Sequence, residues 1–310
     1  MGMSQQDTEF SRAEFETIFI DDCDIRALCC ERAHSFIPDG SMAAPIISER
    51  IIAALRDKSP LSLLRVGNGE GNAVSMAKGE LHPLQISTFY DEFVRQNGIA
   101  APLDAAIMLC RDISSALVSA DIVGFRSFRV DERSVIRDRI KEGNAHAALG
   151  FLYARELLQQ GLIQGFWRQA TITSAWIHLD IVPYLSKILD AANSIIIITG
   201  RAELRDAVRA RVGSRLEAFI TVPVQGFKPE SPDQSHFSKV FPIVRQELDQ
   251  KDLRGKLVLV GAGLFGKVYC HTAKQRGAVA VDLGSAFDVL AGLETRPIHK
   301  QYDISTMRWI

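Results

Sequence analysis

A glycine-rich segment near the C-terminal end has the residue types and the spacing of a phosphate-binding turn. An apolar run over 257–260 leads into it, and its glycines are Gly261, Gly263 and Gly266; a second apolar run ends at Asp282. Such glycines let the backbone turn tightly and approach a phosphate, whose charge the amides of a helix N-terminus can accept. By itself the pattern predicts a dinucleotide site in which Asp282 binds a ribose. The alternative interpretation is a tight turn of a doubly wound sheet, with Asp282 as a helix N-cap or a hydrogen-bonding group of a loop.

A second glycine turn follows an apolar run much earlier in the chain. The segment 65–70 reads Arg-Val-Gly-Asn-Gly-Glu, so Arg65 and Glu70 flank two glycines, Gly67 and Gly69. An arginine can fork onto a diphosphate, and a carboxylate can hold a divalent cation. The alternative interpretation is a tight strand-to-helix turn in which Glu70 interacts favourably with the helix dipole. The residue types alone leave both interpretations open.

Three further polar side chains are candidates for contact with a ligand. Lys228 and His236 lie in a proline-rich loop over 225–236, directly after an expected strand, where open α/β sheets bind ligands. His236 could meet a phosphate there or simply be solvated. Asp288 is a candidate general base or a helix N-cap. The sequence contains no nucleophile elbow, no His-Glu-x-x-His and no Walker lysine pattern, which argues against hydrolases and nucleoside triphosphatases.

The elements that must position these residues alternate between strands and helices. Apolar runs rich in isoleucine and valine, without polar alternation, are typical of a parallel sheet covered on both faces. Strands are predicted at 61–66, 121–125, 171–174, 195–199, 218–222, 257–260 and 279–281, and a helix at 46–55. We therefore predict an α/β protein with a Rossmann-like, mostly parallel sheet, helices on both faces and a partly helical insertion. Residues 1–42 are expected to form a polar N-terminal extension, and 43–310 a single domain.

Composition and charge are those of an ordinary globular protein. The 310 residues are 47% hydrophobic and carry a net charge of −1, from 36 basic and 37 acidic side chains, so a nucleic-acid partner is not expected. The five cysteines form no Cys-x-x-Cys pair, and the N-terminus has no signal-peptide core, which favours a cytoplasmic protein. No apolar run is long enough to span a bilayer. Peripheral membrane association and a homodimer both stay open.

Two separated segments together resemble one family. The first is 65–70, and the second runs over 255–270 and continues through Asp282, Ser285 and Asp288; Arg201, after the mid-chain strand, also fits in order and spacing. These segments resemble the bacterial glycosyltransferases with a GT-D-type fold. The resemblance implies transfer of a sugar from a nucleotide diphosphate, typically a UDP-sugar, to a polysaccharide or glycoprotein acceptor.

The resemblance also implies a divalent metal, Mn²⁺ or Mg²⁺. Members of the family carry an Asp-x-Glu pair at the first segment, which is associated with the metal and the donor diphosphate. Here Asn68 stands in place of the aspartate, and Glu70 remains. An amide oxygen can ligate such a cation, but it brings no charge and therefore weakens the site. We expect Asn68 and Glu70 to be the metal ligands.

The sequence thus predicts a metal-assisted nucleotide-sugar glycosyltransferase in which Glu70 and Asp288 are catalytic. The residues expected to bind the donor are Arg65, Gly67, Asn68, Gly69, Arg201, Lys228, His236, Gly261, Gly263, Gly266, Asp282 and Ser285. Two alternatives stay open. One is a Rossmann-type oxidoreductase with NAD at the C-terminal glycine turn, although such a domain normally opens with this unit. The other is a nucleotide-binding protein whose catalysis is weakened by Asn68.

Overall fold

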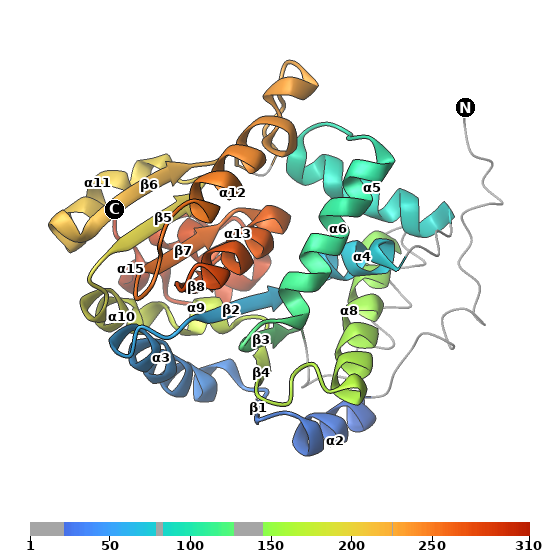
Figure 1. Cartoon of the computed structure of the whole chain (residues 1–310), viewed down its shortest axis with the longest axis horizontal. Coiled ribbons are helices and arrows are strands. Elements are labelled where there is room, and N and C mark those ends of the chain that lie inside the picture. Colours follow the sequence, from blue (N-terminus) through green and yellow to red (C-terminus); the bar gives the residue numbers. More distant parts are fainter. Residues whose placement is uncertain (1–21, 79–82, 127–144, 225) are drawn as a thin grey trace.

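The centre of the molecule is one eight-stranded sheet (Figure 1). The computed structural model describes residues 22–78, 83–126, 145–224 and 226–310. All neighbouring strands are parallel, in the order β1-β4-β3-β2-β8-β7-β5-β6. The strands are β1 (Ser35–Ile37), β2 (Leu61–Val66), β3 (Ile122–Phe125), β4 (Thr171–Ser174), β5 (Ile195–Thr199), β6 (Leu216–Thr221), β7 (Leu257–Gly261) and β8 (Val279–Asp282). The predicted α/β class with a Rossmann-like parallel sheet is confirmed.

The strands form where the sequence is rich in apolar and β-branched residues. Every residue of β3, β5 and β8 is buried, because helices cover both faces of a parallel sheet. In β5, Ile196 and Ile198 enter one core while Ile195 and Ile197 enter the other, as the period of two requires. All seven predicted strands are present, with ends that differ from the predictions by at most two residues.

The N-terminal boundary differs from the prediction. Within the expected extension of 1–42, helix α2 (Asp22–Arg32) buries Ile25 and Cys29 in the core, and β1 pairs with β4 at one edge of the sheet. From residue 22 onward this segment therefore belongs to the domain. A three-residue strand is too short for its apolar pattern to stand out from the polar residues around it. Residues 1–21 lie outside the described part of the chain.

Helices cover both faces of the sheet, and each face has its own apolar cluster (Figure 1). One layer contains α2, α4 (Asn68–Ala77), α5 (Pro83–Asn97), α6 (Leu103–Val118), α8 (Ala145–Gln164), α12 (Phe241–Asp249) and α13 (Gly263–Gln275). The other contains α3 (Gly40–Arg56), α9 (Ile177–Asp180), α10 (Leu185–Ala191), α11 (Arg205–Val212) and α14 (Ala286–Leu290), with α15 (Ile304–Met307) packed against it. Short turns of other helical types are η2 (Val182–Tyr184), η3 (Ala202–Leu204), η4 (Gly213–Arg215), η5 (Pro232–Gln234), η6 (His236–Val240) and η7 (Pro297–Gln301). Among the described residues, no helix has both the length and the apolarity needed to cross a membrane.

The strand order changes direction between β2 and β8. From β2 the chain continues through β3 and β4 on one side, while β7, β5 and β6 lie beyond β8 on the other. Among the described residues, three helices, α4, α5 and α6, lie in the connection between the adjacent strands β2 and β3. Open α/β sheets bind ligands outside the carboxyl ends of their strands at such a point. The fold therefore directs the search for a site to the loops after β2 and β8.

Candidate active site

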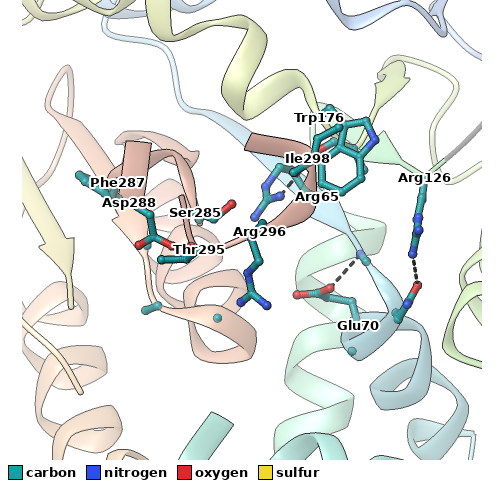
Figure 2. Close-up of a pocket in the computed structure, with 18 of the residues that line it drawn as sticks. Arg65, Glu70, Arg126, Trp176, Ser285, Phe287, Asp288, Thr295, Arg296 and Ile298 are labelled. Carbon is teal, nitrogen blue, oxygen red and sulfur yellow. Dashed lines mark hydrogen bonds between the residues drawn. The ribbon is translucent and has the colours of Figure 1, made fainter. Parts of the chain in front are cut away.

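A cavity of about 1420 Å³ lies at the carboxyl edge of the sheet (Figure 2). The loops after β2, β4, β5, β7 and β8 all contribute to its lining. Segments far apart in the chain meet here because parallel strands end at a common edge. The predicted site residues that line the cavity are Arg65, Gly67, Asn68, Gly69, Glu70, Arg201, His236, Gly261, Gly263, Ser285 and Asp288.

Three predicted residues are not among those that line the cavity. Lys228 is exposed to solvent outside it. Gly266 is buried in α13, where an added Cβ would lie 3.3 Å from Cγ1 of Val260, so this glycine serves close packing of helix on strand. Asp282 lies beneath the cavity floor with 1% of its side chain exposed.

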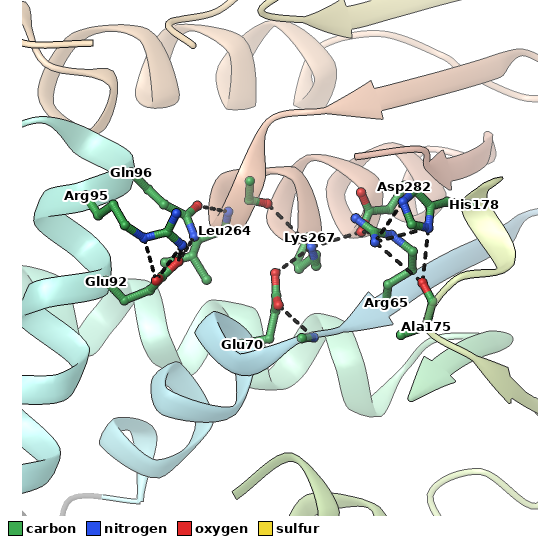
Figure 3. A network of polar contacts seen from close by, with 12 residues as sticks. Arg65, Glu70, Glu92, Arg95, Gln96, Ala175, His178, Leu264, Lys267 and Asp282 are labelled. Carbon is green, nitrogen blue, oxygen red and sulfur yellow. Dashed lines mark hydrogen bonds and ion pairs between the residues drawn. The ribbon is translucent and has the colours of Figure 1, made fainter. Parts of the chain in front are cut away.

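A buried lysine holds the floor of the cavity together (Figure 3). Lys267 lies in α13 with 2% of its side chain exposed, and its Nζ is 2.6 Å from Glu70 Oε1 and 2.9 Å from Asp282 Oδ2. Burial acts to lower the pKa of Lys267, but the charges of Asp282 and Glu70 outweigh it and raise the pKa. Burial likewise acts to raise the pKa of Asp282, and the charges of Lys267 and Arg65 bring it below its ordinary value. Lys267 and Asp282 are therefore both charged at neutral pH.

Glu70 also holds the turn after β2. Its Oε2 accepts a hydrogen bond from the backbone N–H of Gly67 at 2.8 Å, which closes the first turn of α4. The neighbouring Asn68 Oδ1 accepts from Nη1 of Arg126 at 3.3 Å. Glu70 thus lies in the first turn of a helix, as the interpretation of this segment as a tight strand-to-helix turn predicted. The structure adds a buried cationic partner for it in Lys267.

These contacts bear on the predicted metal. Both carboxylate oxygens of Glu70 face N–H donors, and Oδ1 of Asn68 faces a guanidinium. Within the described ranges, no cluster of three or more His, Cys, Asp or Glu side chains could hold a metal ion. Mg²⁺ and Mn²⁺ need several oxygen ligands, so the side chains in this arrangement do not fit such a cation. Titration with Mn²⁺ decides whether a metal binds at Asn68 and Glu70.

Arg65 extends the network from the floor to a buried histidine. Its Nε lies 3.5 Å from Asp282 Oδ2, and its Nη1 lies 3.3 Å from Nε2 of His178. Nδ1 of His178 is 3.1 Å from the carbonyl oxygen of Ala175 and 3.2 Å from Nη1 of Arg65, and Nε2 faces Ser285 Oγ at 3.2 Å. Burial, and after it the charge of Arg65, lowers the pKa of His178 well below its ordinary value, so the ring is neutral. The histidine thereby orients both Arg65 and Ser285 at the cavity wall.

A second polar pair lies on the wall formed by the segments after β5 and β8. Nε of Arg201 donates to Oδ1 of Asp288 at 2.6 Å, and Thr295 donates to the other carboxylate oxygen. The side chains of Arg201 and Asp288 are 23% and 15% exposed, so both can be reached from the cavity. Figure 2 shows Asp288 and Thr295 beside Ser285. The predicted catalytic carboxylate is therefore at the wall, and Arg201 neutralises it.

The glycine turn after β7 is closely packed. A Cβ on Gly261 would lie 2.4 Å from Cδ2 of Phe287, so only glycine fits there. Gly263 has a φ of +56°, and the next N–H, that of Leu264, already donates to Oε1 of Gln96 at 2.8 Å. A side chain from α5 thus occupies one of the N–H groups at the N-terminus of α13, where a phosphate would otherwise be expected.

His236 is buried and has a defined partner. Its ring lies 4.1 Å from that of Phe265, centroid to centroid, and its Nε2 is 3.1 Å from the hydroxyl oxygen of Tyr269. Burial lowers the pKa of His236 to about 3. The ring is therefore neutral at physiological pH and belongs to an aromatic cluster at the cavity wall, while Lys228 lies outside.

Several residues that line the cavity were not among the predicted site residues. Trp176 and Arg126 follow the strands β4 and β3, and Arg296 lies in the loop after α14 (Figure 2). Their positions directly after two predicted strands could have marked Trp176 and Arg126, because ligands bind at that edge. Lys267 is four residues after Gly263 and so on the same helical face as the turn. Its two carboxylate partners, however, come from other elements.

Comparison with protein families matches residues 42–290 to the GT-D fold-like domain. A solved selenomethionine-substituted structure of the domain of unknown function 1792 shares 14% identity over 85% of this chain and 82% of its own, with a TM-score of 0.43. A second structure, described as domain 1792 with a distinct glycosyltransferase fold, shares 14% identity over the same fractions, with a TM-score of 0.42. No match is found among curated proteins. The family match covers most of the chain, and the protein therefore belongs to the GT-D-like family, which supports a glycosyltransferase in general.

Proposed function

We propose that the protein transfers a sugar from a nucleotide diphosphate, in the first instance UDP, to a glycan or glycoprotein acceptor in polysaccharide or glycoprotein assembly. The observation that carries the proposal is the cavity at the strand ends, which has room for a nucleotide sugar and is lined by Arg65, Arg126, Arg201 and Arg296. Guanidinium groups bind phosphate oxygens in a forked geometry. Membership of the GT-D-like family supports the same reaction class. A cytoplasmic location and a homodimer stay predictions.

The chemistry assigns separate tasks to the two walls. In the transfer, an acceptor hydroxyl forms a bond to the anomeric carbon, the bond from that carbon to the diphosphate breaks, and the hydroxyl loses its proton. The transition state resembles an oxocarbenium ion, and negative charge grows on the departing diphosphate. Arg65 and Arg126, near the turn after β2, are placed to stabilise that charge, and we assign Arg201, on the facing wall, to the nucleotide or sugar part of the donor. Asp288, on the opposite wall, is the carboxylate that we assign to the acceptor proton.

The oxidoreductase alternative lacks support from the site. Asp282, which would bind the ribose of NAD, is buried and held by Lys267 and Arg65. Gln96 occupies the N–H of Leu264 at the start of α13. A dinucleotide could bind in the predicted way only if the contacts of both Asp282 and Gln96 were broken. A nucleotide-binding protein without turnover differs from the transferase only in activity, so the experiment must separate binding from transfer.

A thermal-shift panel tests the proposal. UDP-, GDP-, CMP- and dTDP-sugars are compared with NAD(H), because a ligand at about one hundred times its Kd stabilises the fold by about 2.7 kcal/mol. We expect a shift with one class of nucleotide sugar, and we expect Arg201→Ala to reduce it. Arg254→Ala is the matched control, because Arg254 pairs with Asp252 on the exposed surface. Release of the nucleotide from the binding donor, measured with and without glycan acceptors, then reports turnover.

Three results would contradict the proposal in different ways. A shift with NAD(H) alone would favour the oxidoreductase. A nucleotide-sugar shift without turnover on any acceptor, and without donor hydrolysis, would favour the binding protein. If none of the nucleotides shifts the melting temperature, the proposal of a nucleotide site is wrong.

A further inference from the structure

The buried lysine at the cavity floor stands where two carboxylates converge. Nζ of Lys267 contacts Glu70 at 2.6 Å and Asp282 at 2.9 Å, and it lies 3.5 Å from the carbonyl oxygen of Gly263. The two acids come from different parts of the sheet, at the start of α4 and the end of β8. Lys267 also contributes to the lining of the cavity. Its ammonium is therefore a fixed positive charge beside the space proposed for the donor.

Two buried carboxylates this close to one another need a cation between them. Without one, their mutual repulsion and loss of hydration would force one of them to bind a proton. Either an ammonium or a divalent ion can satisfy the pair. In this chain Lys267 does so, and Arg65 approaches Asp282 from the other side at 3.5 Å. The two charges of the acids are thus balanced by two charges of the protein itself.

The turn beside the lysine fits the same arrangement. Asn68 accepts a hydrogen bond from Arg126 but brings no negative charge to it. An aspartate at this position would add a carboxylate and so favour a divalent cation. Because Asn68 carries an amide, the net charge around this turn is more positive than an aspartate would make it.

We infer that Lys267 takes the electrostatic role of a divalent metal, so that the site binds a nucleoside diphosphate without one. The inference rests on the proposed function for the nature of the ligand, but the claim about the metal concerns the protein alone. Glu70 and Asp282 act as positioning residues, because they hold the ammonium and do not bind the ligand. The diphosphate charge is met by Lys267 together with Arg65 and Arg126.

Binding of Mn²⁺ to the ligand-free protein tests the claim about the metal, and electron paramagnetic resonance counts the free ion. We expect no stoichiometric binding to the wild type below millimolar Mn²⁺. Lys267→Met removes the ammonium and leaves Glu70 facing Asp282, so we expect Mn²⁺ to bind at least tenfold more tightly than to the wild type. Lys274→Met is the matched control, because Lys274 lies on the same helix but pairs with a single carboxylate, Asp121. It should behave as the wild type does.

A second titration keeps the inference testable if Lys267→Met fails to fold. Binding of UDP to the wild type is measured by calorimetry in EDTA and again with Mn²⁺, and we expect the same Kd within twofold. Stoichiometric Mn²⁺ binding to the wild type that Glu70→Gln abolishes would overturn the inference. So would a tenfold or greater loss of UDP affinity in EDTA. If no nucleotide binds under either condition, the proposed function fails, and the Mn²⁺ titration of the wild type still decides whether Lys267 excludes the metal.

Discussion

The molecule contains two glycine turns at the ends of neighbouring parts of its sheet, and they do different work. After β7, the glycines allow close packing: Gly261 accommodates the ring of Phe287, and Gln96 accepts a hydrogen bond from the N–H of Leu264 at the start of α13. After β2, the turn is open to the cavity, and the polar side chains of Arg65 and Asn68 reach its wall. Spacing of glycines therefore predicts a tight turn in both cases. Whether a ligand can reach the turn is decided by the side chains that other elements place over it.

The two turns are joined by Lys267, and breaking this link should have the largest effect. Lys267→Ala leaves Glu70 and Asp282 buried without their cation, so we expect a loss of about 3–5 kcal/mol in the free energy of unfolding. Urea denaturation measures it. Lys251 forms a solvent-accessible ion pair with Glu247, four residues before it in the chain. Lys251→Ala removes this pair and should cost less than about 1 kcal/mol. An equal loss of unfolding free energy in both variants would mean that the buried network stabilises the fold no more than a surface ion pair does.

The open turn and the wall that faces it should respond in binding more than in stability. Arg201→Ala removes a guanidinium that we place against the donor, and a hydrogen bond to a charged group contributes about 1.5–3 kcal/mol. We therefore expect roughly a 10- to 100-fold rise in the Kd for the nucleotide sugar, measured by calorimetry. Arg254→Ala should leave the Kd unchanged. A rise of less than threefold in Arg201→Ala would place the donor elsewhere in the cavity.

The packed turn should respond in stability more than in binding. In Gly261→Ala the new Cβ would lie 2.4 Å from the ring of Phe287 and 3.0 Å from the carbonyl oxygen of Gly284. Overpacking of this kind costs about 1–3 kcal/mol. Gly67→Ala, where the nearest atom is a carboxylate oxygen of Glu70 at 3.0 Å, should cost less, because a side chain can shift more easily than a backbone. Thermal unfolding of the two variants checks the order, and the reverse order would contradict the assignment of the packed turn.

The prediction with the smallest effect at neutral pH concerns acid stability on the packed side. The pKa of His236 falls to about 3 on folding, so below pH 6.5 the unfolded chain binds a proton that the folded chain does not. The free energy of unfolding should therefore fall as the pH drops from about 6.5 toward 3, by at most about 1.4 kcal/mol per pH unit for this group. His236→Gln keeps a polar partner for Tyr269 but does not titrate, and its stability should depend less steeply on pH. Identical slopes for variant and wild type, from urea denaturation at several pH values, would show that His236 is solvated.

The sequence predicted the elements better than the contacts between them. Strands β4 and β5 were located to the residue, because both are rich in the β-branched residues that favour strands. The edge strand β1 was missed, because three residues carry too little pattern. The partnership of Lys267 with Glu70 could not be predicted, since it joins residues that only the strand order brings together. The contact of Gln96 with Leu264, which occupies an N–H at the start of α13, could not be predicted for the same reason.

The place of β8 in the sheet has a consequence for how the chain assembles. This strand follows all the other described strands in sequence, yet it lies between β2 and β7 in the middle of the sheet. Until it docks, two half-sheets present unpaired inner edges, which are the kind of edge that recruits other chains. The contacts that close the sheet span much of the sequence, so they form late and slowly. Asp282, at the end of β8, arrives in the same event, and the cavity floor is completed only when the two half-sheets become one.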